Sequence, residues 1–274
     1  MPALPATPPS MRDRYRAQVR QEVKDAALRQ LAAAGPAGVS ISAIGKELGV
    51  SGPALYRYFA SRDDLLTELV IDAYDDLARA LRAAADAASG LAPRARLDAM
   101  ARAYRAWALA EPHRYRLLYA PPLPGYDAHT DRLVEASEAA MNLLLHVIAE
   151  LNDGADGAER PPLPDSPVAG PPVAGAHAAE SAARSPGAGS PVAGAHAAES
   201  PAARSPGPES PLAAQLTAWA GRHRLGADPA TALRAVLVWS RLHGFVSLEI
   251  AGNYASMGID PDPVFEVQLA TLLA

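Results

Sequence analysis

The sequence predicts an all-α protein, and two properties of its composition support that prediction. Hydrophobic residues make up 49% of the chain but aromatic residues only 5%, so alanine supplies much of the apolar content. Alanine favours helices over sheets. The 26 prolines argue against helices, but 16 of them lie within residues 1–10 and 153–211. The rest of the chain is therefore free to be helical.

Two further features of the composition exclude several classes of protein. The chain contains no cysteine, which removes disulfides, thiolate zinc sites and cysteine nucleophiles. No window approaches 18 consecutive apolar residues, and residues 1–10 lack the pattern of a secretory signal. We therefore expect a cytoplasmic protein with no membrane partner, no metal and no cofactor.

The N-terminal third predicts a short tail followed by four helices. Prolines make residues 1–11 a disordered tail. Apolar residues at four-residue spacing then predict a helix of about twenty residues that ends before Gly35-Pro36. The apolar residues that define this helix are Tyr15, Val19, Val23, Ala27 and Leu31.

The next three helices follow from turn and cap residues. A short second helix carries Ile41, Ile44 and Leu48 and ends at Gly49. A third helix is expected to start almost at once, because Ser51 can cap it and Pro53 is tolerated in its first turn. Ser61 and Asp64 have the spacing of a capping box, which predicts a longer fourth helix.

The remaining chain predicts a second helical block that a low-complexity segment interrupts. VAGAHAAES occurs at 173–181 and again at 192–200, and neither copy has the large apolar residues that a stacked repeat needs. We interpret residues 153–211 as a disordered insertion, the first domain as 12–60, and the second as 61–152 with 212–274. Helical patterns in the second block cover 94–110, 112–119, 130–152, 212–221, 229–252 and 263–273.

The segment ISAIGKELGVSGPALYRYF, residues 41–59, carries the strongest functional signal. Two short helices meet through Gly49-Val50-Ser51, which is the arrangement of a helix-turn-helix motif. With Arg62 and Asp63-Asp64-Leu65-Leu66 after it, this segment resembles the DNA-binding domain of the tetracycline-repressor (TetR) family over residues 14–70. Gly45 departs from the alanine usual in the family, and Arg62 from the commoner lysine.

The resemblance implies a role for each residue of the motif. Ser42, Tyr56, Tyr58 and Arg62 would bind phosphates, and Arg57 would read guanine through a bidentate contact. Small residues after Ser51 would let the helix approach the major groove closely. The expected DNA-binding residues are Ser42, Ser51, Gly52, Ala54, Tyr56, Arg57, Tyr58 and Arg62. Although the whole chain has a net charge of −5, residues 1–60 carry eight basic and four acidic residues, which suits a DNA partner.

The second block resembles the WHG-type C-terminal domain that follows some TetR-family DNA-binding domains. Its namesake residues would be Trp239, His243 and Gly244, and small residues on that helix would allow a partner helix to approach. The resemblance implies a homodimer that binds a palindromic operator in double-stranded DNA. The residues expected at the dimer interface are Trp239, Ser240, Gly244, Ser247 and Ala251.

The family also arranges the helices of this domain around an internal cavity. An apolar pocket with some aromatic walls would bind a small hydrophobic effector. The residues expected in this pocket are Met100, Tyr104, Trp107, Tyr119, Leu144 and His243. For each of them, ordinary packing in the core is the competing interpretation.

Two other classes of function stay open at this point. His146 and Glu150 lie one helical turn apart and could serve a metal-dependent enzyme, although no third ligand accompanies them. The acidic run Glu68, Asp72, Asp75 and Asp76 has the pattern of a solvated face. Alternatively, the insertion could make the protein an interaction scaffold. The function that we expect is a non-enzymatic, sequence-specific transcriptional regulator, a repressor that its effector releases.

Overall fold

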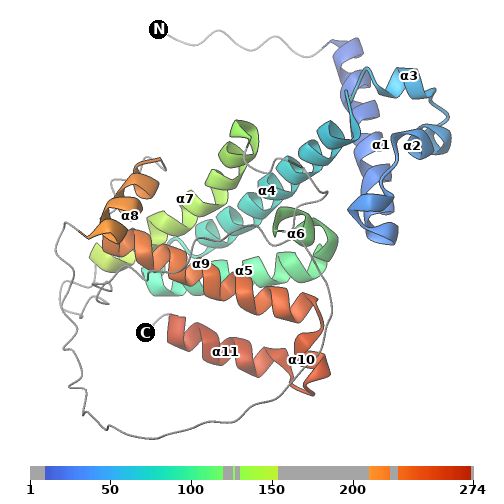
Figure 1. Ribbon diagram of the computed structural model, residues 1–274. Coiled ribbons are helices and arrows are strands. Elements are labelled where there is room, and N and C mark those ends of the chain that lie inside the picture. Colours follow the sequence, from blue (N-terminus) through green and yellow to red (C-terminus); the bar gives the residue numbers. More distant parts are fainter. Residues whose placement is uncertain (1–9, 120–125, 127–129, 154–209, 223–227, 273–274) are drawn as a thin grey trace, which may run out of the picture.

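The computed structural model describes residues 10–119, 126, 130–153, 210–222 and 228–272 (Figure 1). Every regular element within these ranges is a helix, so the predicted all-α fold is confirmed. Most of the tail predicted at 1–11 and of the insertion predicted at 153–211 lies outside the described residues.

The N-terminal domain consists of three α-helices and the start of a long fourth one. Its elements are α1 (Met11–Ala34), the 3-10 turn η1 (Pro36–Gly38), α2 (Ile41–Leu48), α3 (Gly52–Leu55) and α4 (Arg62–Ala87). Helix α1 begins four residues before the apolar pattern that predicted it, because Ser10 and Asp13 form a reciprocal capping box. Tyr15, the first residue of that pattern, is 64% exposed, whereas the other four are buried.

Caps define the other helices of this domain, with two differences from the prediction. Ser51 occupies the N-cap position of α3, but its side chain makes no capping hydrogen bond. Ser61 Oγ does accept from the Asp64 amide at 3.0 Å, whereas the Asp64 carboxylate bonds the amide of Ala60 rather than that of Ser61. The predicted capping box is thus present only in part.

A small apolar core holds the N-terminal domain together. Leu55 is the last residue of α3, and Phe59 lies four residues after it. The two side chains are 0% and 1% exposed and pack with residues of α1, α2 and α4. Arg20 of α1 lies over the Phe59 ring at 4.5 Å and donates to the Tyr58 carbonyl at 2.5 Å. The segment that follows α3 is thereby fixed against α1.

Over the described ranges, the second domain adds seven helices after α4, and the first three of them pack directly against it. The added helices are α5 (Pro93–Ala110), α6 (Pro112–Tyr119), α7 (Asp131–Asp153), α8 (Pro211–Arg222), α9 (Pro229–Ile250), α10 (Asn253–Ser256) and α11 (Pro261–Leu272). The six predicted helices all occur with bounds shifted by at most two residues, and η1 and α10 are additional. In Figure 1, α4, α5, α7 and α9 form the body of this domain, and α11 lies along the outer side of α9.

Arg105 of α5 fastens the C-terminal helix to this body. Its guanidinium binds Glu249 of α9 and Asp262 of α11 and lies over the Phe265 ring at 4.7 Å. Because Phe265 is only 1% exposed, the ion pairs cover an apolar contact between three helices. Arg105 thus ties α9 to both α5 and α11, while part of the surface of α9 stays exposed to solvent.

Candidate DNA-binding surface and effector cavity

The helix-turn-helix motif presents polar side chains to solvent at the start of each of its two helices and in the turn after the second helix. Tyr56 is 56% exposed, and Ser42, Ser51 and Arg57 are also exposed. Regular α-helix ends at Leu55, so Tyr56 and Arg57 stand on the tight turn that follows the second helix of the motif and not on that helix itself. These four side chains are available to a duplex without any rearrangement of the core.

The other four predicted DNA-binding residues are half-buried: Gly52, Ala54, Tyr58 and Arg62. Arg62 donates from Nη2 to the Pro36 carbonyl at 2.5 Å, and its Nε is buried without a hydrogen-bond partner among the described residues. Arg62 therefore connects the start of α4 to η1. The phosphate contact expected of it stays a prediction, and the geometry gives this residue a structural role as well.

Two glycines determine the sharp turn between α2 and α3. Gly49 has φ 66° and ends α2 in the left-handed conformation, which favours glycine. Gly45 is buried, and an ideal Cβ there would lie 2.8 Å from the Val50 carbonyl oxygen. The glycine at position 45 thus allows α2 to approach the turn closely, which offsets its low helix propensity.

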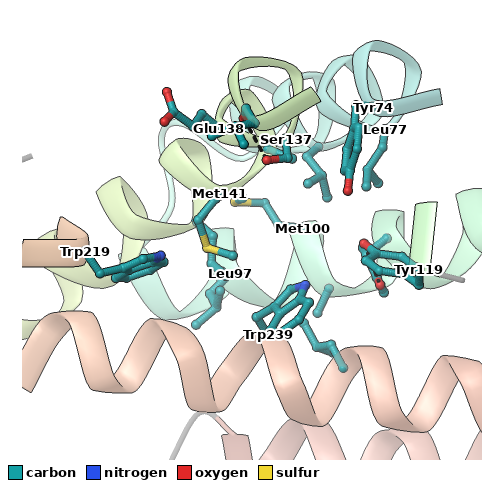
Figure 2. Close-up of a pocket in the computed structure, with 17 residues that line it drawn as sticks. Tyr74, Leu77, Leu97, Met100, Tyr119, Ser137, Glu138, Met141, Trp219 and Trp239 are labelled. Atoms are coloured by element: carbon teal, nitrogen blue, oxygen red, sulfur yellow. Dashed lines mark hydrogen bonds between the residues drawn. The ribbon is translucent and has the colours of Figure 1, made fainter. Parts of the chain in front are cut away.

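The second domain contains a cavity of about 420 Å³ between α4, α5, α6, α7, α8 and α9 (Figure 2). Trp219 lies at one end of it and Tyr119 at the other, with Met100 and Met141 between them. The lining residues are Tyr74, Leu77, Leu81, Leu97, Met100, Ala101, Tyr104, Tyr119, Val134, Ser137, Glu138, Ala140, Met141, Leu144, Trp219, Trp239 and Leu242. Such a volume suits a small organic ligand.

Four of the six residues predicted for the pocket line this cavity, namely Met100, Tyr104, Tyr119 and Leu144. Trp107 does not, because its indole is turned to α4 and donates to Asp76 Oδ2 at 3.1 Å. His243 lies behind the wall, stacked on Trp239 with 5.4 Å between ring centroids and 8° between planes. Trp239, which we expected at the dimer interface, is the residue of this pair that faces the cavity.

Hydrogen-bonded aromatic rings continue from the cavity wall into the protein. Tyr104 and Tyr119 hydroxyls are 3.2 Å apart. Behind them, the Tyr115 hydroxyl lies 2.9 Å from His243 Nδ1 and 2.8 Å from Ser247 Oγ. Ser247 was also expected at the dimer interface, but its hydroxyl points inward to Tyr115. Burial lowers the pKa of His243, which favours the neutral imidazole.

The phenols of the cavity stay protonated. Burial raises the pKa of Tyr74, Tyr104 and Tyr119 above the ordinary value for tyrosine. A buried phenol without a nearby cation remains a neutral hydrogen-bond donor. The polar groups on this wall are therefore uncharged at neutral pH.

Sequence reasoning missed two aromatic residues of the cavity. Tyr74 lies on the predicted fourth helix and points into the cavity from α4, and Trp219 comes from α8 (Figure 2). For Tyr74, the spacing of four residues from Val70 and three from Leu77 was an available signal. For Trp219 there was none, because α8 reaches the cavity only through the folded arrangement of the domain.

The acidic residues of α4 link the two domains, which corrects their interpretation as a solvated face. Glu68 binds Arg20 and Lys24 of α1 and Arg132 of α7. Its pKa is below the ordinary value: burial would raise it, but the bonds to Arg132 and Arg20 outweigh that effect. Further along α4, Asp76 binds Arg114 of α6. Helix α4 is thus fixed by charge to elements of both domains.

Among the described residues, no group of three His, Asp or Glu side chains is arranged to hold a metal ion. Glu150, one of the pair considered for an enzyme, binds Arg96, and His146 lies 2.8 Å from the Asn142 carbonyl. Over the same described part of the chain, no helix has the length and apolar character needed to cross a membrane.

A helix-turn-helix domain joined by one continuous helix to an all-helical domain with an internal cavity defines a class, the one-component DNA-binding transcriptional regulators. Residues 24–69 match the family of bacterial regulatory proteins named after TetR, and residues 97–272 match the tetracycline repressor-like C-terminal domain. The chain belongs to the TetR family of transcriptional regulators. The WHG subtype of its C-terminal domain stays a prediction.

Relatives and solved structures support this assignment over nearly the whole chain. The HTH-type transcriptional regulator Rv1816 of Mycobacterium tuberculosis is 30% identical over 260 residues, which cover 94% of this chain and 92% of the relative. A crystal structure of the putative regulatory protein SCO4313 is 36% identical, with a TM-score of 0.64 and coverage of 96% and 99%. A protein of unknown function from Rhodococcus sp. RHA1 shares the fold at 20% identity and a TM-score of 0.58. None of the matched families is an enzyme family.

Proposed function

We propose that this regulator is a homodimeric repressor that binds a palindromic operator and is released by a small hydrophobic effector. The observation that carries the proposal is the course of α4. Its first turns, with Leu65, Leu66 and Leu69, belong to the core of the helix-turn-helix domain, and Leu77 and Leu81 line the cavity. One rigid element therefore senses the cavity and supports the DNA-binding surface (Figure 1).

The DNA-binding side of the proposal rests on the exposed end of the motif. Tyr56 and Ser42 can donate to phosphates, and Arg57 has the length and the freedom to reach a guanine edge. The half-buried Gly52 and Ala54 leave room for the backbone to approach the major groove. Phosphate contacts would fix the register of the motif, and Arg57 would supply sequence preference.

The dimer side rests on the outer face of α9 and α11. Leu237, Leu248 and Val267 are 42%, 45% and 65% exposed, and Ser240 and Ala251 are exposed beside them. A Cβ added to Gly244 would meet nothing within 4 Å, so no neighbour in the protomer requires this glycine. A second copy that packs on this face would bury the apolar side chains and use the space over Gly244.

The operator would be released because the effector binds the protein more tightly when α4 is displaced than when α4 is in its DNA-binding placement. A ligand in the cavity contacts Tyr74 and Leu77, and a shift of this helix would alter the Glu68 ion pairs to α1. Because α1 is packed against the segment after α3, the spacing of the two recognition segments in a dimer would change. An effector acts only as far as it prefers the displaced arrangement.

Selection of bound sequences from random duplex DNA tests the proposal most directly. The expected product is a palindrome whose half-sites lie on one face of the duplex. Compounds that lower binding to this operator identify the effector. An Ala140→Phe variant, which fills the cavity, should bind the operator but lose the response. Failure to enrich any sequence, or enrichment of a single asymmetric site, would contradict the proposal.

A further inference from the structure

The cavity carries information on the electrical charge of its ligand. Of its 17 lining residues, one is ionisable at neutral pH, Glu138, and none of the 17 is Lys, Arg or His. Glu138 lies at the rim, and in Figure 2 its carboxylate points away from the aromatic rings. The interior surface is therefore made of apolar groups and of neutral phenol and indole donors.

Four arginines on α5 and α7, two of the helices around the cavity, are paired with carboxylates outside it. On α5, Arg96 pairs with Glu150, Arg102 with Glu266, and Arg105 with Glu249 and Asp262. On α7, Arg132 pairs with Glu68. To reach a ligand in the cavity, any of these guanidinium groups would have to leave a carboxylate partner.

An anionic ligand would therefore enter an apolar space without a counter-ion. Burial of an unpaired carboxylate should lower affinity by at least about a hundredfold, because its hydration is lost and a few neutral donors, with no counter-ion, replace it only in part. A cation would also lose its hydration, and the one carboxylate near the cavity points away. An uncharged molecule escapes both penalties.

The hydroxyl groups of the wall indicate where the polar part of the ligand would lie. Tyr74 points into the cavity near the end that Tyr119 and Trp239 form, and Met100, Met141 and Leu97 line the middle (Figure 2). Phenols with a raised pKa donate hydrogen bonds and suit an oxygen acceptor. The opposite end, with Trp219, offers another aromatic surface for stacking.

From this distribution we infer that the effector is an uncharged aromatic or alicyclic molecule with a hydroxyl or carbonyl oxygen at one end. The cavity discriminates against carboxylates and ammonium ions of the same shape. The inference rests on the proposed function, because it specifies the chemical class of the effector that this function requires.

Three biphenyl compounds of nearly the same shape test the discrimination by charge. They are 4-biphenylmethanol, 4-biphenylcarboxylate and 4-biphenylmethylammonium, and each competes with the uncharged fluorescent probe N-phenyl-1-naphthylamine for the full-length protein. We expect the alcohol to displace the probe at a concentration at least tenfold below that of either ion. Equal or tighter binding of the carboxylate or the ammonium ion would overturn the inference and leave the effector-responsive function standing.

Two variants locate the binding and change its selectivity. Ala140→Phe should abolish probe binding, and unchanged binding in this variant would place the probe outside the cavity and overturn the inference. Met141→Lys should improve carboxylate binding at least tenfold relative to the neutral polar control Met141→Gln. No difference between these two variants, both shown to be folded by circular dichroism, would also overturn it. If neither the probe nor any biphenyl binds the wild-type protein, the cavity is not a ligand site and the effector part of the proposed function fails first.

Discussion

The two functional regions of this protein differ in how their residues are assembled and in the chemistry they present. The DNA-binding surface comes from a contiguous segment, with Tyr56 and Arg57 exposed and a surplus of basic residues in the domain. The cavity comes from six helices distant in sequence, and its wall is aromatic and, apart from Glu138 at the rim, uncharged. Ionic strength, packing and charge substitutions should therefore affect the two regions differently.

The largest expected difference concerns salt. If a dimer contacts about 6–10 phosphates, operator affinity should fall by roughly 10³–10⁵ between 50 and 200 mM salt, since counterions are released on binding. Binding of N-phenyl-1-naphthylamine, an uncharged ligand of an uncharged cavity, should change by less than about twofold over the same range. Titrations of both by fluorescence give the two slopes. A flat slope for DNA would contradict the DNA-binding assignment.

The second difference concerns packing around two buried leucines. Leu66 is 0% exposed in the core of the DNA-binding domain, and Leu97 is 1% exposed but borders the cavity. Leucine-to-alanine substitutions in cores cost about 2–5 kcal/mol, and the cost rises with the number of atoms that packed against the deleted groups. We expect Leu66→Ala to lie at the upper end of this range and Leu97→Ala at the lower end.

Urea denaturation measures the loss of unfolding free energy in both variants. Both are compared at one protein concentration, because dimerisation makes stability depend on concentration. The slope of unfolding free energy against urea should be the same in both variants. A loss for Leu97→Ala as large as that for Leu66→Ala would mean that the space beside Leu97 is closed in solution.

The difference between the two regions also explains what the sequence could predict. The helix-turn-helix motif depends on neighbours fewer than twenty positions apart, so the spacing of Ile44, Gly49, Leu55 and Phe59 was sufficient. The cavity depends on how each helix of the second domain is rotated about its axis. Trp107 and Trp239 lie on similar amphipathic helices, but packing of α5 against α4 turns the first away from the cavity, and packing of α9 against α5 and α7 turns the second towards it.

Ion pairs show the same limit of prediction from local sequence. Glu68 and Asp72 lie in an acidic run that has the pattern of a solvated face, but their partners Arg20 and Lys24 come from α1. Pairing over such a sequence distance leaves no local signal. Caps, in contrast, are local: the start of α1 could have been predicted from Ser10 and Asp13, which have the spacing of a capping box.

A smaller effect is expected at the residue that would read the operator. Arg57→Ala should relax base preference at one position by about 1–3 kcal/mol, because a bidentate contact to guanine is lost. Lys46→Ala is the matched control, since Lys46 is an exposed residue of α2 and carries the same charge. The affinity of each protein variant for the operator and for single-base changes of the operator gives the base preference of Arg57→Ala and of Lys46→Ala. Equal losses on operator and random DNA for Arg57→Ala would show that this residue contacts phosphate only.

The smallest expected effect concerns the charge link between the domains. Glu68→Gln removes a carboxylate that is 16% exposed and binds three basic residues, and it should cost about 1 kcal/mol at pH 7. The folded-state pKa of Glu68 lies below its ordinary value of 4.5. Its contribution is therefore complete above pH 4.5 and is lost as the pH falls through the folded-state pKa.

Unfolding free energies of wild type and Glu68→Gln should accordingly converge at acidic pH. Glu135→Gln is the control, because Glu135 is an exposed carboxylate on α7, and its substitution should change stability by less than about 0.5 kcal/mol at either pH. If Glu68 links the cavity to the DNA-binding domain, its loss should also reduce the effect of an effector on operator affinity, while binding of the effector itself stays the same. A loss of stability without a change in this coupling would assign Glu68 to stability alone and leave the transmission to the apolar packing of α4.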